Sequence, residues 1–197
     1  MTQTPQTFAM GRTEFVALVA TMLATVAFSI DAMLPALPQI GAELSPQRIE
    51  NAPLILTLFL LGMGLGTFIT GPLSDAYGRK PVILTFSALY ILGAALAWAS
   101  QSLEMLLAAR LLQGFGAAGP RVVALAVVRD RFSGRQMAQV VSVVMMIFTL
   151  VPAFAPLLGD FIVAWTGWRG IFAAFIVFSM FYCAWVLLRL PETLPPA

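Results

Sequence analysis

Six long runs of apolar residues dominate this sequence, and each is close to the length of about 20 residues that a helix needs to cross a membrane. The chain is 60% hydrophobic and only 10% charged, whereas a soluble domain carries about 25% charged residues. Backbone polar groups in lipid must be satisfied within the spanning structure, which favours helices. The sequence therefore predicts an all-α membrane protein with six transmembrane helices.

Three regions follow from this pattern. Residues 1–12 are a polar N-terminal tail, residues 13–190 form the six-helix transmembrane bundle, and residues 191–197 begin a loop or tail. Pro35 and Pro38 are expected to end the first span, and a polar loop is expected over residues 39–51. The expected spans are 14–33, 52–74, 81–100, 103–128, 136–165 and 168–190.

Basic residues are distributed unevenly between the two sides of this six-span arrangement. The loops of one side are rich in Arg and Lys, whereas those of the other side hold only Arg48 and Arg169. Cytoplasmic loops are enriched in Lys and Arg, so the rich side, and with it both termini, is expected to be cytoplasmic. The first span is expected to be retained and not cleaved as a signal. The loops of the rich side carry Arg79, Lys80, Arg129, Arg131 and Arg135.

Several classes of function are disfavoured. The chain has no histidine and a single cysteine, Cys183, so neither a metal site nor an internal disulfide is expected. We find no nucleophile and base in a catalytic pattern, which argues against an enzyme, and no cofactor is indicated. The net charge of +2 is too small to indicate nucleic-acid binding. Any proton chemistry must fall to carboxylates.

Arg110 lies inside the fourth span, where a guanidinium costs at least a few kcal/mol unless it is paired or hydrated. Gln113 and Gly114 follow at three and four residues and share its helical face. Arg121 returns to nearly the same face, which should look into the protein or a wet cavity. The alternative is a structural arginine held by carbonyl groups.

Asp31 lies in the last turn of the first span, at a depth similar to that of Arg110. We expect the two to be close or linked through water. Desolvation and a neighbouring arginine act in opposite directions on a carboxylate, so a proton could be exchanged against a substrate there. The alternative is that Asp31 only caps the helix end at the interface.

Small residues recur every four positions in the second and fourth spans, a spacing that lets helices approach closely. Close packing is the main interpretation, and sliding during conformational switching is a further role. In the fifth span, Pro152 and Pro156 predict a bent, cavity-lining helix, and Asp160 near its outer end is expected at a solvated interface. The small residues are Gly62, Gly66 and Thr70 in the second span, and Gly114 and Ala118 in the fourth.

The stretch 71–80 is expected to form a charged loop between the second and third spans. It resembles the signature G-x-L-x-D-x-x-G-R-K of the major facilitator superfamily. Ala76 stands where a basic residue is usual. The matching residues are Gly71, Leu73, Asp75, Gly78, Arg79, Lys80 and, four further on, the apolar Leu84.

Two further segments resemble motifs of proton-coupled members of that superfamily. Residues 110–118 are similar to R-x-x-Q-G-x-G-A-A, which implies a role for Arg110 in proton coupling. Residues 155–160, including Pro156 and Gly159, resemble a degraded glycine-proline motif of antiporters. Residues 31–38, the Arg129-Asp130 pair and residues 190–194 are similar to the bicyclomycin/chloramphenicol-resistance (Bcr/CflA) branch of drug:proton antiporters.

The resemblance implies half of a major facilitator fold, built from two inverted three-helix repeats. It also implies that Asp75 and Arg79, with Asp130 from the end of the fourth span, form a cytoplasmic gate together with Gly71, Gly78 and Lys80. The alternative for these residues is a solvated turn with extended charged side chains.

The function implied is proton-coupled efflux of small amphipathic drugs by alternating access, in the inner membrane of a bacterium. The partners implied are drug-like substrates, protons, the lipid bilayer and a second six-helix half, for which a homodimer is one form. The expected functional form is a half-size unit that dimerises. The alternative is a non-transporting truncated fragment, or a membrane subunit that needs a separate second half.

Overall fold

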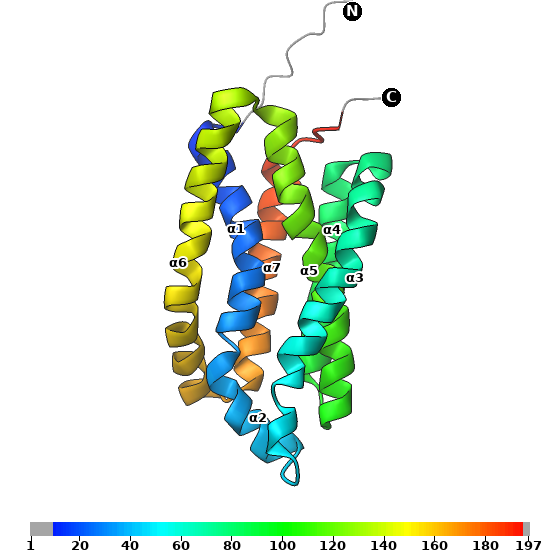
Figure 1. Ribbon diagram of the computed structural model, residues 1–197, viewed down its shortest axis with the longest axis vertical. Coiled ribbons are helices and arrows are strands. Elements are labelled where there is room, and N and C mark those ends of the chain that lie inside the picture. Colours follow the sequence, from blue (N-terminus) through cyan, green and yellow to red (C-terminus); the bar gives the residue numbers. More distant parts are fainter. Residues whose placement is uncertain (1–9, 195–197) are drawn as a thin grey trace, which may run out of the picture.

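The computed structural model describes residues 10–194, and these residues are helical without any strand. Six of the helices are long and apolar enough to cross a membrane, which confirms the six expected spans. They lie roughly along the long axis of the molecule (Figure 1). Most of the tail expected at residues 1–12, and residues 195–197, fall outside the described residues. The long helices are α1 (Arg12–Asp31), α3 (Leu54–Tyr77), α4 (Arg79–Trp98), α5 (Leu103–Arg131), α6 (Gly134–Thr166) and α7 (Arg169–Arg189).

The polar loop expected over residues 39–51 is wrong, because this segment is largely helical. A 3-10 turn η1 (Leu34–Ala36) leads into a short helix α2 (Leu37–Leu44), and a second turn η2 (Ile49–Asn51) precedes α3. Pro35 and Pro38 are the second residues of η1 and α2, in the first turn, where a missing N–H costs little. The two prolines therefore start new helical segments after α1.

The loop expected over residues 71–80 is also wrong. Helix α3 continues through Pro72 to Tyr77, and α4 begins at Arg79, so that Gly78 alone separates them. Gly78 has φ +99°, in the region that residues with a Cβ rarely adopt. The glycine therefore allows the reversal between the two helices within one residue.

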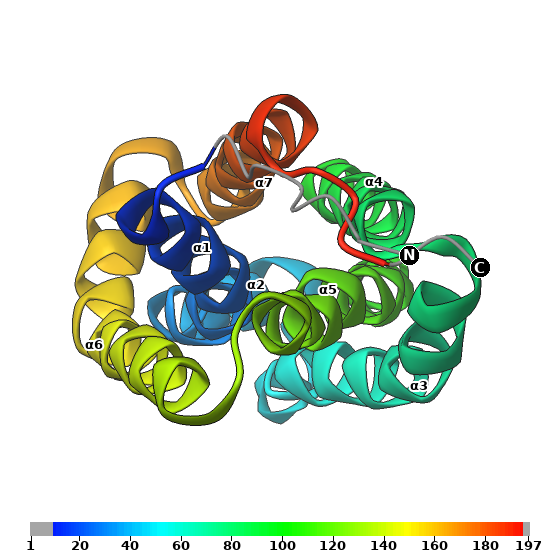
Figure 2. The same ribbon diagram turned by 90° about the horizontal axis from the view of Figure 1, so that it is seen from above.

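The connections divide between the two ends of the bundle (Figure 1). The start of α1, the end of α7 and the α3–α4 and α5–α6 junctions gather at one end, here called the Arg79 end, and α2 lies at the other. Figure 2 shows α5 beside α3 and α4, and α1 beside α6. The pairs α3–α5 and α1–α6 are equivalent if two three-helix repeats are related by a two-fold axis, in agreement with the expected repeats.

Glycines bring α3 and α5 into backbone contact. A Cβ added to Gly62 would lie 2.0 Å from the carbonyl oxygen of Leu111, and one added to Gly114 would lie 1.9 Å from that of Phe59. No side chain fits at such distances. The small-residue pattern expected for close packing thus lies at the α3–α5 contact, where Ala118 also faces Gly66.

Glycines also allow close backbone contact elsewhere in the bundle. A Cβ on Gly159 of α6 would lie 2.1 Å from the carbonyl oxygen of Ala32, and a Cβ on Gly116 would lie 2.3 Å from the backbone nitrogen of Tyr90 in α4. Pro152 and Pro156 lie inside α6. Helix α5 thus approaches two neighbours through glycines, and α6 approaches the end of α1 in the same way.

The outer surfaces of two helices remain largely uncovered. Only 17% of the apolar window of α6 and 28% of that of α3 are buried, against 67% in the segment that contains α1. These two helices therefore present the apolar faces most available to lipid or to another membrane domain.

The α3–α5 contact gives a direct test with a matched control on the same helix. We expect Gly62→Ala to lower the free energy of unfolding by about 1–3 kcal/mol, because the helices must move apart. Gly64 has no atom within 4 Å of an added Cβ, so Gly64→Ala should be neutral or slightly stabilising through helix propensity, by up to about 1 kcal/mol. Thermal unfolding of the purified variants in detergent measures both changes, and equal melting temperatures would contradict the packing argument.

Candidate functional site

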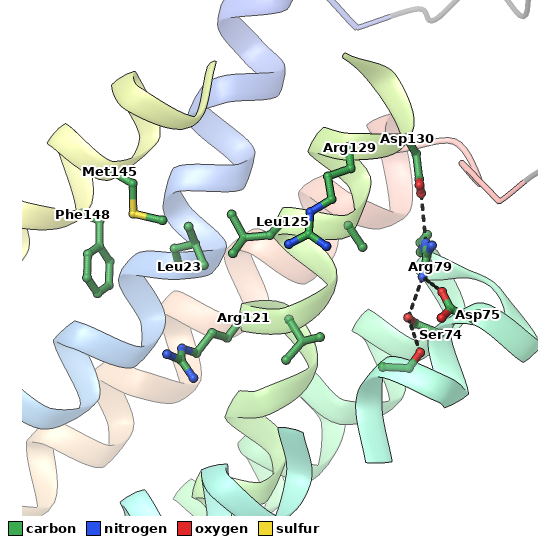
Figure 3. A pocket seen from close by; sticks show the side chains of 13 residues that line it. Leu23, Ser74, Asp75, Arg79, Arg121, Leu125, Arg129, Asp130, Met145 and Phe148 are labelled. Atoms are coloured by element: carbon green, nitrogen blue, oxygen red, sulfur yellow. Dashed lines mark hydrogen bonds and ion pairs between the residues drawn. The ribbon is translucent and has the colours of Figure 1, made fainter. Parts of the chain in front are cut away.

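Arg79, the first residue of α4, joins three helices at the Arg79 end (Figure 3). Its Nε donates to Oδ2 of Asp130 at 2.9 Å, and its Nη1 donates to Oγ of Ser74 at 2.7 Å and to Asp75. Asp130 comes from the end of α5, and Ser74 and Asp75 come from the last turn of α3. The expected association of Arg79 with both acids is therefore present in this structure.

The two ion pairs of Arg79 differ in their exposure to solvent. The Arg79 side chain is 11% exposed, the Asp130 side chain 20% and the Asp75 side chain 67%. Solvent screening weakens an exposed pair far more than a shielded one. The pair with Asp130 therefore contributes more to holding α4 and α5 together, and Asp75 adds an orienting contact within the α3–α4 turn.

A carboxylate from the end of the chain completes this cluster. Glu192 accepts hydrogen bonds from the backbone N–H groups of Arg79 at 2.8 Å and Lys80 at 3.1 Å. These are unpaired donors at the start of α4, so Glu192 caps the helix from a distant segment, where an anion is also favoured by the helix dipole. A Cβ on Gly78 would lie 2.7 Å from the Glu192 carboxylate, which gives this glycine a second reason to be there.

Two neighbouring contacts tie the same segment to the cluster. Oγ1 of Thr193 donates to Oδ2 of Asp130 at 3.1 Å, and Nζ of Lys80 donates to the carbonyl oxygen of Leu187 in α7 at 2.8 Å. Reasoning from sequence did not assign Glu192 or Thr193 to the site. The available signal was an acid directly after the sixth span, on the side of the membrane where α4 begins.

Burial acts to raise the pKa of Glu192, but the N–H groups of Leu194, Arg79, Lys80 and Thr193 outweigh it and lower the pKa below its ordinary value of 4.5. A carboxylate with a lowered folded-state pKa stabilises the fold above its ordinary pKa. This stabilisation is lost as the pH falls below 4.5 and passes through the folded-state pKa of Glu192. The cap on α4 is therefore an acid-sensitive contact.

Arg110 lies near the other end of α5 and is fully buried. Its guanidinium donates to Oε1 of Gln113 at 2.8 Å and to the backbone carbonyl oxygens of Ser29 at 3.0 Å and Ile55 at 3.4 Å. The ring of Phe59 lies 4.3 Å from its central carbon, a geometry that adds a cation–π attraction. Arg110 and Gln113, which share a helical face in the sequence, are thus brought together.

Among the described residues, Asp31 and Arg110 do not form an ion pair. Carbonyl groups, Gln113 and an aromatic face take the place of the expected counter-ion. Asp31 is the last residue of α1 and is half-buried. The two residues do lie at one level of the bundle, because Arg110 contacts Ser29, two residues before Asp31.

A pocket of about 610 Å³ extends from the Arg79 cluster between α1, α3, α5 and α6. Figure 3 shows Arg121 and Arg129 of α5 extending into the space that Met145 and Phe148 of α6 border on the other side. Arg110 and Arg121 were expected on nearly the same face of α5. In the structure, Arg110 lies in the protein interior and Arg121 extends into the pocket. The polar lining comprises Ser74, Asp75, Arg79, Arg121, Arg129 and Asp130.

Comparison with known proteins agrees with this architecture. Residues 17–197 match the family model described as Major Facilitator Superfamily. The chain belongs to the major facilitator superfamily. The human organic anion transporter MFSD10 has the same fold over 94% of this chain and 49% of its own length, with a TM-score of 0.74 and 21% sequence identity.

Two curated bacterial relatives of this superfamily protein carry names connected with drug resistance. It is 34% identical to a bicyclomycin resistance protein homolog from Haemophilus influenzae and 33% identical to the multidrug resistance protein MdtL from Escherichia coli K12, over 84% and 85% of the chain. It is 36% identical to the uncharacterised MFS-type transporter YdgK from Bacillus subtilis. The chain spans 42% to 43% of the length of these relatives, and so is similar to less than half of each.

The cap formed by Glu192 should be visible in the pH dependence of stability. At pH 7 we expect Glu192→Gln to lower the free energy of unfolding by about 1–2 kcal/mol, as for loss of a helix cap. The difference from the unmodified protein should shrink as the pH falls below 4.5, where Glu192 becomes protonated in both folded and unfolded states. Melting temperatures between pH 7 and pH 3 measure it.

Glu50 provides the matched control for this experiment. It is exposed and makes no side-chain hydrogen bond within the described part of the chain. Glu50→Gln should leave the melting temperature unchanged at every pH. A Glu192→Gln variant whose deficit stays constant down to pH 3 would show that the carboxylate charge does not carry the capping.

Proposed function

We propose that this chain forms a six-helix half of a secondary transporter that exports small amphipathic drugs in exchange for protons by alternating access. The observation that carries the proposal is the Arg79 cluster, which joins three helices beside a pocket of about 610 Å³. The names of the bicyclomycin-resistance and multidrug-resistance relatives support a drug as substrate.

In this proposal the Arg79 end faces the cytoplasm of a bacterium, and the protein lies in the inner membrane with both termini cytoplasmic. The junctions that meet at this end carry Arg79, Lys80, Arg129, Arg131 and Arg135, and cytoplasmic segments are enriched in such residues.

The Arg79 cluster is the proposed cytoplasmic gate. Asp75, Arg79 and Asp130 hold the ends of α3, α4 and α5 together, and Gly71, Gly78 and Lys80 complete the turn around them. Because the Arg79 side chain is largely shielded and pairs with acids of two other helices, the cluster favours one arrangement of these helices. A two-state element of this kind biases an equilibrium between conformations.

Proton coupling is assigned to Asp31, Arg110 and Gln113. The Asp31 carboxylate makes no hydrogen bond or ion pair among the described residues, so it is available to a proton. The charge of Arg110 is held at the same level by Ser29 and Gln113. In surroundings of low dielectric, a change in the charge of Asp31 acts strongly on a nearby cation, which links protonation to the packing of α1 against α5.

A second six-helix half completes the proposed transporter, and a homodimer is one form of it. The exposed apolar faces of α3 and α6 favour such an assembly. The glycine-mediated contacts of α3, α5 and α6 would let the helices slide during switching. The residues assigned to packing and switching are Gly62, Gly66, Gly114, Ala118, Pro152, Pro156 and Gly159.

A second candidate function is a membrane subunit that transports only with a separately made second half. The largely uncovered apolar faces of α3 and α6 would provide the contact surface for that second half. The mass of the purified protein in nanodiscs separates the two, because a homodimer has twice the mass of the chain and a lone subunit does not.

Transport in proteoliposomes tests the proposal directly. With the chain reconstituted alone, we expect an imposed pH gradient to drive accumulation of chloramphenicol or another small amphipathic drug. Asp31→Asn should reduce this gradient-driven component to the level of empty liposomes, because the amide cannot carry a proton. Asp160 is exposed on α6, and Asp160→Asn is the control that should transport normally. Gradient-driven transport by Asp31→Asn would remove Asp31 from the coupling role.

The gate can be tested through accessibility from the Arg79 end. In a Cys183→Ser background, Ala126→Cys places a thiol in the lining of the pocket. We expect Arg79→Ala to raise its rate of labelling by a membrane-impermeant maleimide about 5- to 150-fold, the range of a coupling of about 1–3 kcal/mol.

Arg135 gives the control for this measurement, because it is an exposed arginine at the same end outside the pocket lining. Arg135→Ala should leave the labelling rate as it was. An Arg79→Ala variant with unchanged labelling and unchanged transport would contradict the proposal that the cluster is a gate.

A further inference from the structure

Two arginines of α5, Arg121 and Arg129, extend into the pocket without a partner (Figure 3). Neither makes a side-chain hydrogen bond, an ion pair or a ring contact among residues 10–194. Both side chains are exposed. This separates them from Arg79 and Arg110, whose guanidinium groups are occupied by acids or by carbonyl oxygens.

The depth of Arg121 makes its free guanidinium significant. It lies ten residues before Arg131, the last residue of α5, which corresponds to about 15 Å along the helix. At this depth the surroundings are the hydrocarbon layer unless a wet cavity or another protein replaces it. An unpaired arginine there is unfavourable, and charged residues within membrane spans commonly mark substrate or ion pathways.

The rest of the pocket fits an amphipathic ligand. Across from Arg121, the wall is apolar and is formed by Leu23 of α1 and by Met145 and Phe148 of α6 (Figure 3). A thioether and a ring adapt to varied apolar groups. The two acids of the lining, Asp75 and Asp130, both bond to Arg79, so they do not neutralise Arg121.

We propose that the pocket binds small amphipathic anions, with a carboxylate or sulfonate on Arg121 and the apolar body against Met145 and Phe148. This rests on the proposed function, since it names the substrate class of the same transporter. A guanidinium donates paired, charge-assisted hydrogen bonds to such a group. Arg129 lies eight residues nearer the Arg79 end, about 12 Å along the helix, and attracts anions toward the pocket.

Binding without any gradient tests this separately from transport. The probes are 2-naphthoate and its neutral analogue 2-naphthamide, which share one ring system and differ in charge. Their affinities are measured on the purified chain in phosphatidylcholine nanodiscs. We expect naphthoate to bind about 10- to 100-fold more tightly, the range of a charge-assisted hydrogen bond.

Substitutions then locate the preference. Arg121→Gln should remove the preference for naphthoate and leave binding of naphthamide unchanged, and Arg121→Lys should retain most of it. Arg135→Gln, which removes one positive charge outside the pocket lining, is the control and should retain the full preference. A general effect of net charge would instead appear equally in the Arg121→Gln and Arg135→Gln variants.

Each other outcome overturns the inference. Equal affinities for the two probes, or no binding of either, would show that the pocket does not select anions. If phosphatidylglycerol in the nanodiscs abolishes naphthoate binding, Arg121 holds a lipid phosphate. If Arg121→Gln halves the mass of the assembly, Arg121 pairs with an acid of a second copy. Loss of proton-driven transport with an intact naphthoate preference would count against the proposed function alone.

Discussion

The burial of one positive charge is the constraint on which the bundle depends most. Arg110 has no exposed surface, and a guanidinium inside a membrane protein must find acceptors or destabilise the fold. It finds them on α1 at Ser29, on α3 at Ile55 and on its own helix at Gln113, with the ring of Phe59 across its face. These acceptors have to arrive together, so a single side chain fixes the relative position of three helices.

Glycines make that arrangement possible, because the backbone carbonyls of α1 and α3 reach Arg110 only if the helices lie very close. Gly62 and Gly114 allow this approach at the α3–α5 contact. Helix α5 then runs as one element from Arg110 to Asp130, whose carboxylate holds Arg79. A shift of α5 as a rigid element would therefore disturb both Arg110 and the Arg79 cluster, and would connect the residues proposed for proton coupling to the proposed gate.

Sequence reasoning could find the elements of this arrangement more readily than their contacts. Apolar length gave the six spans, and the spacing of Gly62 and Gly66 indicated the close helix contact. For Arg110 it left open a link to Asp31, direct or through water, and an arginine held by carbonyl groups; the structure shows the carbonyls of Ser29 and Ile55 and the Gln113 side chain. It also missed Glu192, since its capping of α4 depends on where the end of α7 lies, and it took a one-residue junction at Gly78 for a loop.

Three arginines of this bundle lie in three different surroundings. Arg79 is neutralised by Asp75 and Asp130, and Arg110 is solvated by carbonyl dipoles and a ring. In both cases the compensating groups belong to the described residues and hold the helices in one arrangement. Arg121 has neither, although it lies on the same helix between Asp130 and Arg110. Since the described residues give Arg121 no compensating charge and its side chain is exposed to the pocket, the anionic group of the proposed ligand would supply that charge and be recognised by it.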